Sequence, residues 1–230
     1  MLDDHEHESY RRFHERRHGM LLDLLNCHAQ PRQKRCLDIG GGGDVAGAGA
    51  VIRERYAEEL HAVDLGDDVE KGRQRGAISV PCNVDWERLP YEDSFFDLVL
   101  FASVVEHLYN PHTVLREIAR VLRPGGLLVL EAPNAVALGR RLDALMGRNP
   151  FRWFNQYNAV ENKSLMIYCA VFYTPEEIEA ALAPEFEVIE HRYCMHAPSV
   201  NPCKRWLREA AFRLNPRLGD CFFVVARRKE

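Results

Sequence analysis

Hydrophobic residues form two recurring patterns along this chain: short apolar runs, and longer segments in which apolar positions recur every three or four residues. The short runs predict strands over residues 35–39, 61–64, 77–81, 96–101, 127–131, 186–191 and 221–226. The run over 96–101 is almost unbroken, which is typical of a parallel strand covered on both faces.

Segments with helical spacing alternate with these runs and predict helices over residues 8–26, 45–60, 111–122, 136–146 and 204–214. A further helix is expected to begin after Thr174, because Thr174 and Glu177 fit a capping box. The sequence Arg123-Pro124-Gly125-Gly126 predicts a break after the helix over 111–122. This alternation of strands and helices favours a doubly wound α/β sheet.

Composition narrows the class of protein. The chain has 230 residues, of which 47% are hydrophobic and 28% are charged, as in ordinary globular domains. The net charge of −4 argues against a nucleic-acid-binding protein. No apolar stretch reaches the roughly 18–20 residues of a membrane span, and the acidic first residues are unlike a signal peptide. We therefore expect a cytoplasmic protein without integral membrane association.

The seven cysteines contain no CxxC pair, so the sequence favours free thiols over a disulfide framework or a zinc site. The cluster His5-Glu6-His7 lies in the polar N-terminal segment, where a solvated helix end is expected. We therefore expect no bound metal.

The strongest chemical signal is a glycine-rich turn directly after the strand over 35–39. Glycines let a ligand approach the backbone, and ligands of open α/β sheets bind at the carboxyl ends of strands. Asp64 ends the next strand, 26 positions after Asp38, and its carboxylate could accept hydrogen bonds from both hydroxyls of a ribose. Taken alone, these features suit NAD and S-adenosylmethionine equally, since residues 41–46 also fit the dinucleotide fingerprint formally.

Further motifs distinguish between NAD and S-adenosylmethionine as the ligand. The segments Asp38-Ile39-Gly40-Gly41-Gly42, Asp85–Tyr91, Ser94–Val99, Glu106-His107-Leu108 and Leu115–Gly126 occur in this order. Together they resemble the class I S-adenosylmethionine-dependent methyltransferases, in particular the small-molecule methyltransferases. The resemblance covers residues 34–132 and is weaker at 173–178. It implies a Rossmann-like, seven-stranded, mostly parallel sheet whose last strand is antiparallel.

We expect the single domain 1–230 to be divided into three parts. Residues 1–30 would form an N-terminal helical lid carrying Tyr10, Phe13 and His14, or would simply pack on the sheet edge. Residues 34–132 would form the cofactor-binding core. Residues 134–172 and 193–217 would form a substrate cap of helices and loops.

By the same resemblance, S-adenosyl-L-methionine is the cofactor. Asp38 and the loop of Gly40, Gly41 and Gly42 would face its methionine part, and Asp64 would hold the ribose. Asp85 would bond the adenine amino group, with Trp86 or Leu65 packed on the ring. Asp44 stands where the family usually has a third glycine. It leaves open whether the site binds the cofactor weakly.

His107 is the favoured catalytic residue, because it follows the fourth strand and histidine titrates near neutral pH. It could act as a general base or only orient the acceptor, and Glu106, His14 and His196 are weaker candidates. Aromatic residues over 151–157, with Tyr168 and Tyr173, suit an acceptor pocket or a satellite core. The basic helix over 204–214 suits a solvated face better than an anionic surface.

The sequence thus predicts methyl transfer to an oxygen or nitrogen of a small molecule, such as a sugar or glycan precursor or a secondary metabolite. Two alternatives stay open: an NAD-dependent oxidoreductase, and a non-catalytic partner protein with a degenerate cofactor site. The sequence does not specify an oligomeric state.

Overall fold

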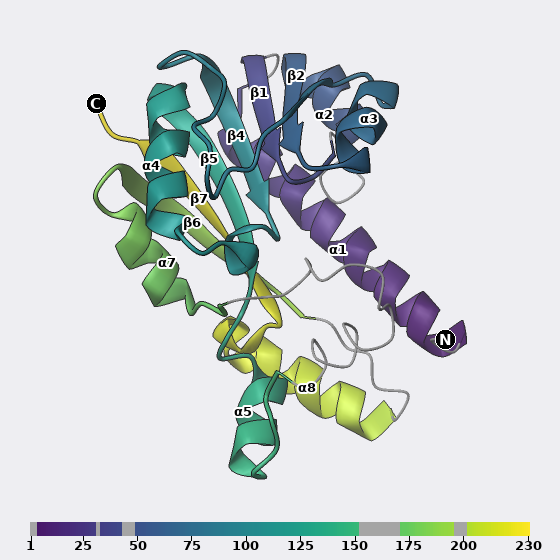
Figure 1. Ribbon diagram of the computed structural model, residues 1–230. Helices are drawn as coiled ribbons and strands as arrows, with labels where there is room; N and C mark the ends of the chain where they lie inside the picture. The colour runs from purple at the N-terminus through teal and green to yellow at the C-terminus, as the bar shows by residue number, and fades with distance from the viewer. Residues whose placement is uncertain (1–3, 31–32, 43–48, 152–170, 196–201) are drawn as a thin grey trace.

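The computed structural model describes residues 4–30, 33–42, 49–151, 171–195 and 202–230 (Figure 1). A seven-stranded sheet runs through the molecule in the order β3-β2-β1-β4-β5-β7-β6. Only β7 is antiparallel to its neighbours, β5 and β6. The predicted doubly wound, mostly parallel sheet with an antiparallel last strand is confirmed. The strands are β1 (Gln33–Ile39), β2 (Ala57–Asp64), β3 (Ile78–Pro81), β4 (Phe96–Ala102), β5 (Leu122–Pro133), β6 (Phe186–Cys194) and β7 (Cys221–Arg228).

Helices cover both faces of the sheet. The apolar residues of α4 and α7 pack on one face, which is turned toward the viewer in Figure 1. Those of α1 and α2 pack on the other face. The helical elements are α1 (Asp4–His28), α2 (Gly49–Arg55), α3 (Asp67–Gln74), the 3-10 turn η2 (Val105–His107), α4 (Pro111–Val121), α5 (Leu138–Leu145), α7 (Pro175–Leu182), α8 (Pro202–Leu214) and the 3-10 turn η3 (Pro216–Leu218).

The predicted helix over 45–60 is wrong in its second half. Helix α2 ends at Arg55, and the chain is already a strand at Ala57. The strand extends backward because Ala57 to Val63 pairs in parallel with β1 and so satisfies its backbone hydrogen bonds there. The first residues of that prediction, 45–48, lie outside the described residues.

The sequence predicts a break at Arg123–Gly126, but in the structure these residues belong to β5. Phe96 pairs with Leu122 but Leu98 pairs with Leu127, so the extra residues form a bulge in the ladder. Gly125 has a φ of 72°, which a glycine tolerates better than other residues. The signal for irregular backbone was correct, but the bulge interrupts the pairing without ending the strand.

The start of α7 follows the prediction in detail. The Glu177 N–H donates to the Thr174 hydroxyl oxygen at 3.2 Å, and the Thr174 N–H donates to the Glu177 carboxylate at 2.7 Å. Pro175 is the first residue of the helix. The capping box thus fixes where helix α7 begins.

Candidate active site

The glycine-rich turn lies at the point where the strand order reverses. Strand β1 has β2 on one side and β4 on the other, and Gly40 follows its last residue, Ile39. Gly40 is exposed, and its N–H donates to the Val63 carbonyl at 2.9 Å. Such a switch point in an open α/β sheet is where ligands bind, so the turn is the natural centre of a site.

Two glycines of this turn have no room for a side chain. A Cβ on Gly40 would lie 2.5 Å from a methyl carbon of Val104, which follows β4. A Cβ on Gly41 would lie 2.5 Å from both carboxylate oxygens of the buried Asp38. Val104 and Asp38 therefore fill the inner side of the turn. Its open side presents only backbone, as close approach of a ligand requires.

Asp64 stands beside the turn at the end of β2. Its carboxylate accepts a hydrogen bond from the Gly42 N–H at 2.9 Å and another from the Leu65 N–H at 2.8 Å. Partial burial raises the pKa of Asp64, although both hydrogen bonds oppose the shift. Leu65, beside it, is half exposed and offers an apolar surface at the same edge of the sheet.

Arg75 supports the turn from the end of α3, and sequence reasoning missed it. Its guanidinium donates to the Gly42 carbonyl at 3.0 Å. No local motif marks this arginine, because the two residues are 33 positions apart. Gly42 is thus held through its N–H by Asp64 and through its carbonyl by Arg75.

Asp85 and Trp86 lie on the loop after β3. The Asp85 carboxylate accepts hydrogen bonds from the N–H groups of Tyr109 and Asn110, each at 3.0 Å. It therefore ties this loop to the segment before α4. The centroid of the exposed Trp86 ring lies 6.0 Å from that of the Tyr109 ring. Tyr109 is also exposed, and the sequence did not mark it as a candidate. The adenine-binding roles of Asp85 and Trp86 stay predictions.

The predicted catalytic residue, His107, lies in the 3-10 turn η2 after β4 and is half-buried. Its neighbour Glu106 is almost fully buried, and the Glu106 carbonyl accepts from the Val171 N–H at 3.2 Å. The turn begins after Ser103, whose φ of 55° is uncommon for a residue other than glycine. The structure brings His107 to the carboxyl end of β4; whether it is a base stays a prediction.

A buried polar cluster lies beside this turn and was not predicted. Glu131 of β5 accepts hydrogen bonds from the Arg17 guanidinium of α1 and from the Ser103 hydroxyl, the latter at 2.6 Å. Burial raises the pKa of Glu106 to about 8, and the Glu131 charge adds to this shift. The positive charges of Arg17 and Arg140 oppose it. Oxygen Oε2 of Glu106 has no hydrogen-bond partner among the described residues.

Comparison with known proteins agrees with this geometry. Residues 37–130 match the model of the methyltransferase domain family. A probable S-adenosylmethionine-dependent methyltransferase of Mycobacterium tuberculosis is 31% identical over 169 residues, covering 70% of this chain and 59% of that protein. The ubiquinone/menaquinone biosynthesis C-methyltransferase of Serratia proteamaculans is 34% identical over 136 residues, or 52% of each chain. Residues 37–130 thus belong to the family of S-adenosylmethionine-dependent methyltransferase domains. The chain spans between half and three fifths of the length of these curated relatives.

Among solved structures, the N-methyltransferase NodS of Bradyrhizobium japonicum, in complex with S-adenosyl-L-homocysteine, has the same fold. The TM-score is 0.58 at 18% identity, covering 95% of this chain and 88% of that one. The antiparallel β7, inserted between β5 and β6, also departs from the common dinucleotide-binding order 3-2-1-4-5-6. The strand order thus differs from the order common among dinucleotide-binding folds, and the family match favours a methyltransferase over the NAD-dependent alternative.

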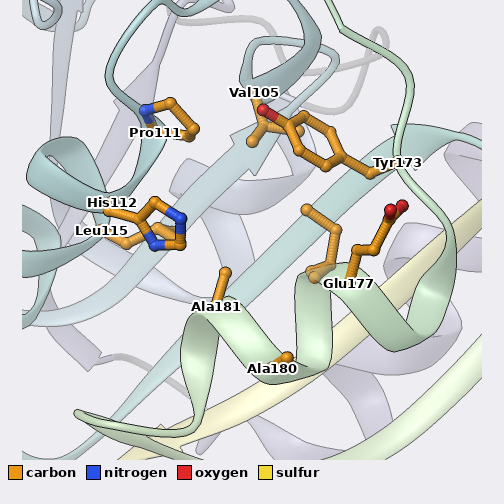
Figure 2. A pocket seen from close by; sticks show the side chains of 9 residues that line it. Val105, Pro111, His112, Leu115, Tyr173, Glu177, Ala180 and Ala181 are labelled. Carbon is orange, nitrogen blue, oxygen red and sulfur yellow. The ribbon is translucent and has the colours of Figure 1, made fainter.

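A cavity of about 330 Å³ lies between α4 and α7 of this methyltransferase fold. Its wall is mostly apolar, and Figure 2 shows the rings of His112 and Tyr173 on opposite sides of it. Val105, which immediately precedes Glu106, also lines it. Such a pocket suits the apolar part of a small molecule.

Several other sequence predictions concern the periphery. Asp44, His196, Tyr168 and most of the aromatic segment over 151–157 lie outside the described residues, as do the side chains of Tyr10 and Phe13. Phe151 stacks on Phe172 with ring centroids 4.3 Å apart. On α8, Trp206 and Leu207 are exposed, whereas Arg208 pairs with Asp220 at 3.1 Å.

The described part of the chain holds no group of three or more metal-binding side chains. It also holds no helix long and apolar enough to cross a membrane.

Proposed function

We propose that this protein transfers a methyl group from S-adenosyl-L-methionine to an oxygen or nitrogen of a small molecule. The observation that carries the proposal is the glycine turn at the β1/β4 switch point, exposed at Gly40, with the Asp64 carboxylate beside it. Membership of the methyltransferase family supports the same cofactor.

The residues at this edge of the sheet fit the cofactor. The backbone of Gly40, Gly41 and Gly42 would hold its methionine part. Gly40 packs against Val104 and Gly41 against Asp38, so these two glycines present only backbone on the open side. Asp64 would accept hydrogen bonds from the ribose hydroxyls. Asp85 would bind the adenine amino group, and the side chains of Leu65 and Trp86 would flank the ring.

When bound, S-adenosylmethionine supplies a methyl group activated by a positively charged sulfur. The chain's own task is to place the acceptor and to manage the proton of its hydroxyl or amine. His107, in the turn after β4, would accept that proton or orient the acceptor. The cavity between α4 and α7 would hold an apolar part of the acceptor.

The acceptor class follows less directly. The curated relatives include ubiquinone biosynthesis O-methyltransferases and ubiquinone/menaquinone biosynthesis C-methyltransferases. We propose a hydroxylated acceptor, which includes phenols, sugars or glycan precursors and hydroxylated secondary metabolites. Transfer of label from methyl-labelled S-adenosylmethionine to a panel of short-chain phenols, sugars and amines would rank these classes.

Calorimetric titration with S-adenosylhomocysteine and, separately, with NADH tests the cofactor. We expect S-adenosylhomocysteine to bind with one site per chain and NADH not to bind. Binding of NADH alone would favour the oxidoreductase alternative. Binding of neither at millimolar concentration would favour a non-catalytic partner protein.

A further inference from the structure

We propose that Glu106 is the ionisable group that balances the charge of the cofactor. It would be a carboxylate when positively charged S-adenosylmethionine is bound and protonated when neutral-sulfur S-adenosylhomocysteine is bound. The proposal rests on the cofactor site described above. It gives that site a means of distinguishing the methyl donor from the spent product.

The position of Glu106 connects it to the glycine turn. Strands β1 and β4 are neighbours, with Ile39 opposite Phe101 in the parallel ladder. Beyond their ends, Gly40 lies so close to Val104 that a Cβ would meet its methyl carbon at 2.5 Å. Glu106 follows two residues after that contact, in η2. The packed contact between Gly40 and Val104 therefore joins the turn to the segment that carries the buried Glu106.

The surroundings of Glu106 make its ionisation sensitive to one added charge. The charged groups that act on it come from three elements: Arg17 of α1, Glu131 of β5 and Arg140 of α5. Arg17 is directly bonded to Glu131, so the nearest positive charge is already matched by a carboxylate. Glu106 in turn acts on the Tyr173 hydroxyl, which stands before α7. Glu106 Oε2 itself is buried and has no hydrogen-bond partner among the described residues.

The direction of the effect follows from these charges. Burial and Glu131 raise the pKa of Glu106 to about 8, so Glu106 is mostly protonated at pH 7 in the unliganded protein. A positive charge nearby stabilises the carboxylate and lowers that pKa. Binding of S-adenosylmethionine should therefore release a large part of one proton. Binding of S-adenosylhomocysteine should leave Glu106 protonated.

The test is calorimetric titration of both ligands at pH 7 in buffers of different ionisation enthalpy, which counts the protons released. The amino and carboxyl groups of the ligands also titrate, so the deciding comparison is between the parent and Glu106→Gln for each ligand. We expect the parent to release more protons than Glu106→Gln with S-adenosylmethionine, and the same number with S-adenosylhomocysteine. Glu92→Gln, at an exposed position outside the proposed site, should behave like the parent.

A second readout is the ratio of the two affinities against pH. In the parent, preference for S-adenosylmethionine should rise by up to about tenfold per pH unit between about pH 6 and 8, after correction for the ligands' own titration. In Glu106→Gln this rise should vanish. If that variant does not fold, a flat corrected ratio in the parent still overturns the proposal.

Equal proton counts in the parent and Glu106→Gln for both ligands would overturn the proposal, as would a flat corrected ratio in the parent. Both results differ from the failure of either ligand to bind the parent. That failure would overturn the cofactor assignment itself, and this proposal with it.

Discussion

The backbone N–H of Gly42 donates a hydrogen bond to Oδ2 of Asp64 over 2.9 Å, across the gap between the ends of β1 and β2. The glycine turn and the proposed ribose-binding carboxylate are thus one unit. A ligand that bonds to Asp64 would meet the turn backbone at the same time. The relationship also means that substitutions at Asp64 act on the turn as well as on the ligand.

Asp64→Ala should lower the affinity for S-adenosylhomocysteine by about tenfold to a hundredfold, because hydrogen bonds to a charged group contribute roughly 1.5–3 kcal/mol. The protein should still fold, with a small fall in melting temperature, since Asp64 stands half-buried at a strand end and the Gly42 N–H loses its acceptor. Calorimetry and thermal unfolding measure the two effects. Asp67→Ala, in the exposed first turn of α3, is the matched control and should bind as the parent does. Unchanged affinity in Asp64→Ala would show that the ribose assignment is wrong.

Gly41→Ala should weaken both the fold and the site. The new Cβ would lie 2.5 Å from both oxygens of the buried Asp38, so the turn must move away from β1. Overpacking of this kind costs about 1–3 kcal/mol. Urea unfolding should show that loss, and S-adenosylhomocysteine affinity should fall with it.

The control for Gly41→Ala is Gly19→Ala in α1, where an added Cβ has no atom within 4 Å beyond the helix itself. This control should stabilise the protein by about 0.5–1 kcal/mol, because alanine favours helix more than glycine does. Equal stability of Gly41→Ala and the parent would contradict the packing of Asp38 under the turn.

Glu106→Gln should become more stable relative to the parent as pH rises. The pKa of Glu106 is raised to about 8 in the folded protein, well above its ordinary value of 4.5. The folded chain therefore holds this proton more tightly, and the parent loses stability as pH rises from about 4.5 to about 8. Glutamine does not titrate. The difference in melting temperature should grow across that window and then level off.

Thermal unfolding of the parent and Glu106→Gln from pH 5 to pH 9 measures this difference. Glu92→Gln, at an exposed position, should run parallel to the parent throughout. A difference between the parent and Glu106→Gln that does not depend on pH would mean that Glu106 is ionised in the folded protein over the whole range.

Arg17→Met should destabilise the protein by about 3–5 kcal/mol, because removing one partner of a buried ion pair leaves the other without compensation. Glu131 is buried and would keep only the Ser103 hydroxyl of the two side-chain donors described above. The double variant Arg17→Met/Glu131→Gln should recover most of the loss. Urea unfolding of the single and double variants measures the coupling. Strict additivity of their effects would contradict it.

The periodicity of the sequence predicts most of the fold, because buried parallel strands and amphipathic helices leave distinct patterns. It fails where pairing with a distant strand outweighs local preference. Residues 57–60 continue the helical pattern of α2 but pair with β1. The residues of β1 lie too far away in the sequence for a local pattern to reveal this pairing. The Arg123–Gly126 segment carries turn signals, yet β4 on one side and β7 on the other hold the flanking residues in the sheet.

The site divides in the same way. The positions of Asp38, the glycine turn and Asp64 at strand ends could be predicted, because they follow from the strand pattern; their roles toward the cofactor stay predictions. The Arg17–Glu131 pair could not, since its members are 114 positions apart and meet only when α1 packs on the sheet. The sequence ranks Glu106 below His107 as a candidate, because only burial and the nearby Glu131 distinguish its carboxyl group from an ordinary one.

The most direct test of the central claim is a crystal structure of the protein with S-adenosylhomocysteine. We predict the ribose hydroxyls within hydrogen-bond distance of the Asp64 carboxylate and the ligand's methionine part against the backbone of Gly40, Gly41 and Gly42. A ligand bound elsewhere, with Asp64 still bonded only to the N–H groups of Gly42 and Leu65, would contradict the claim.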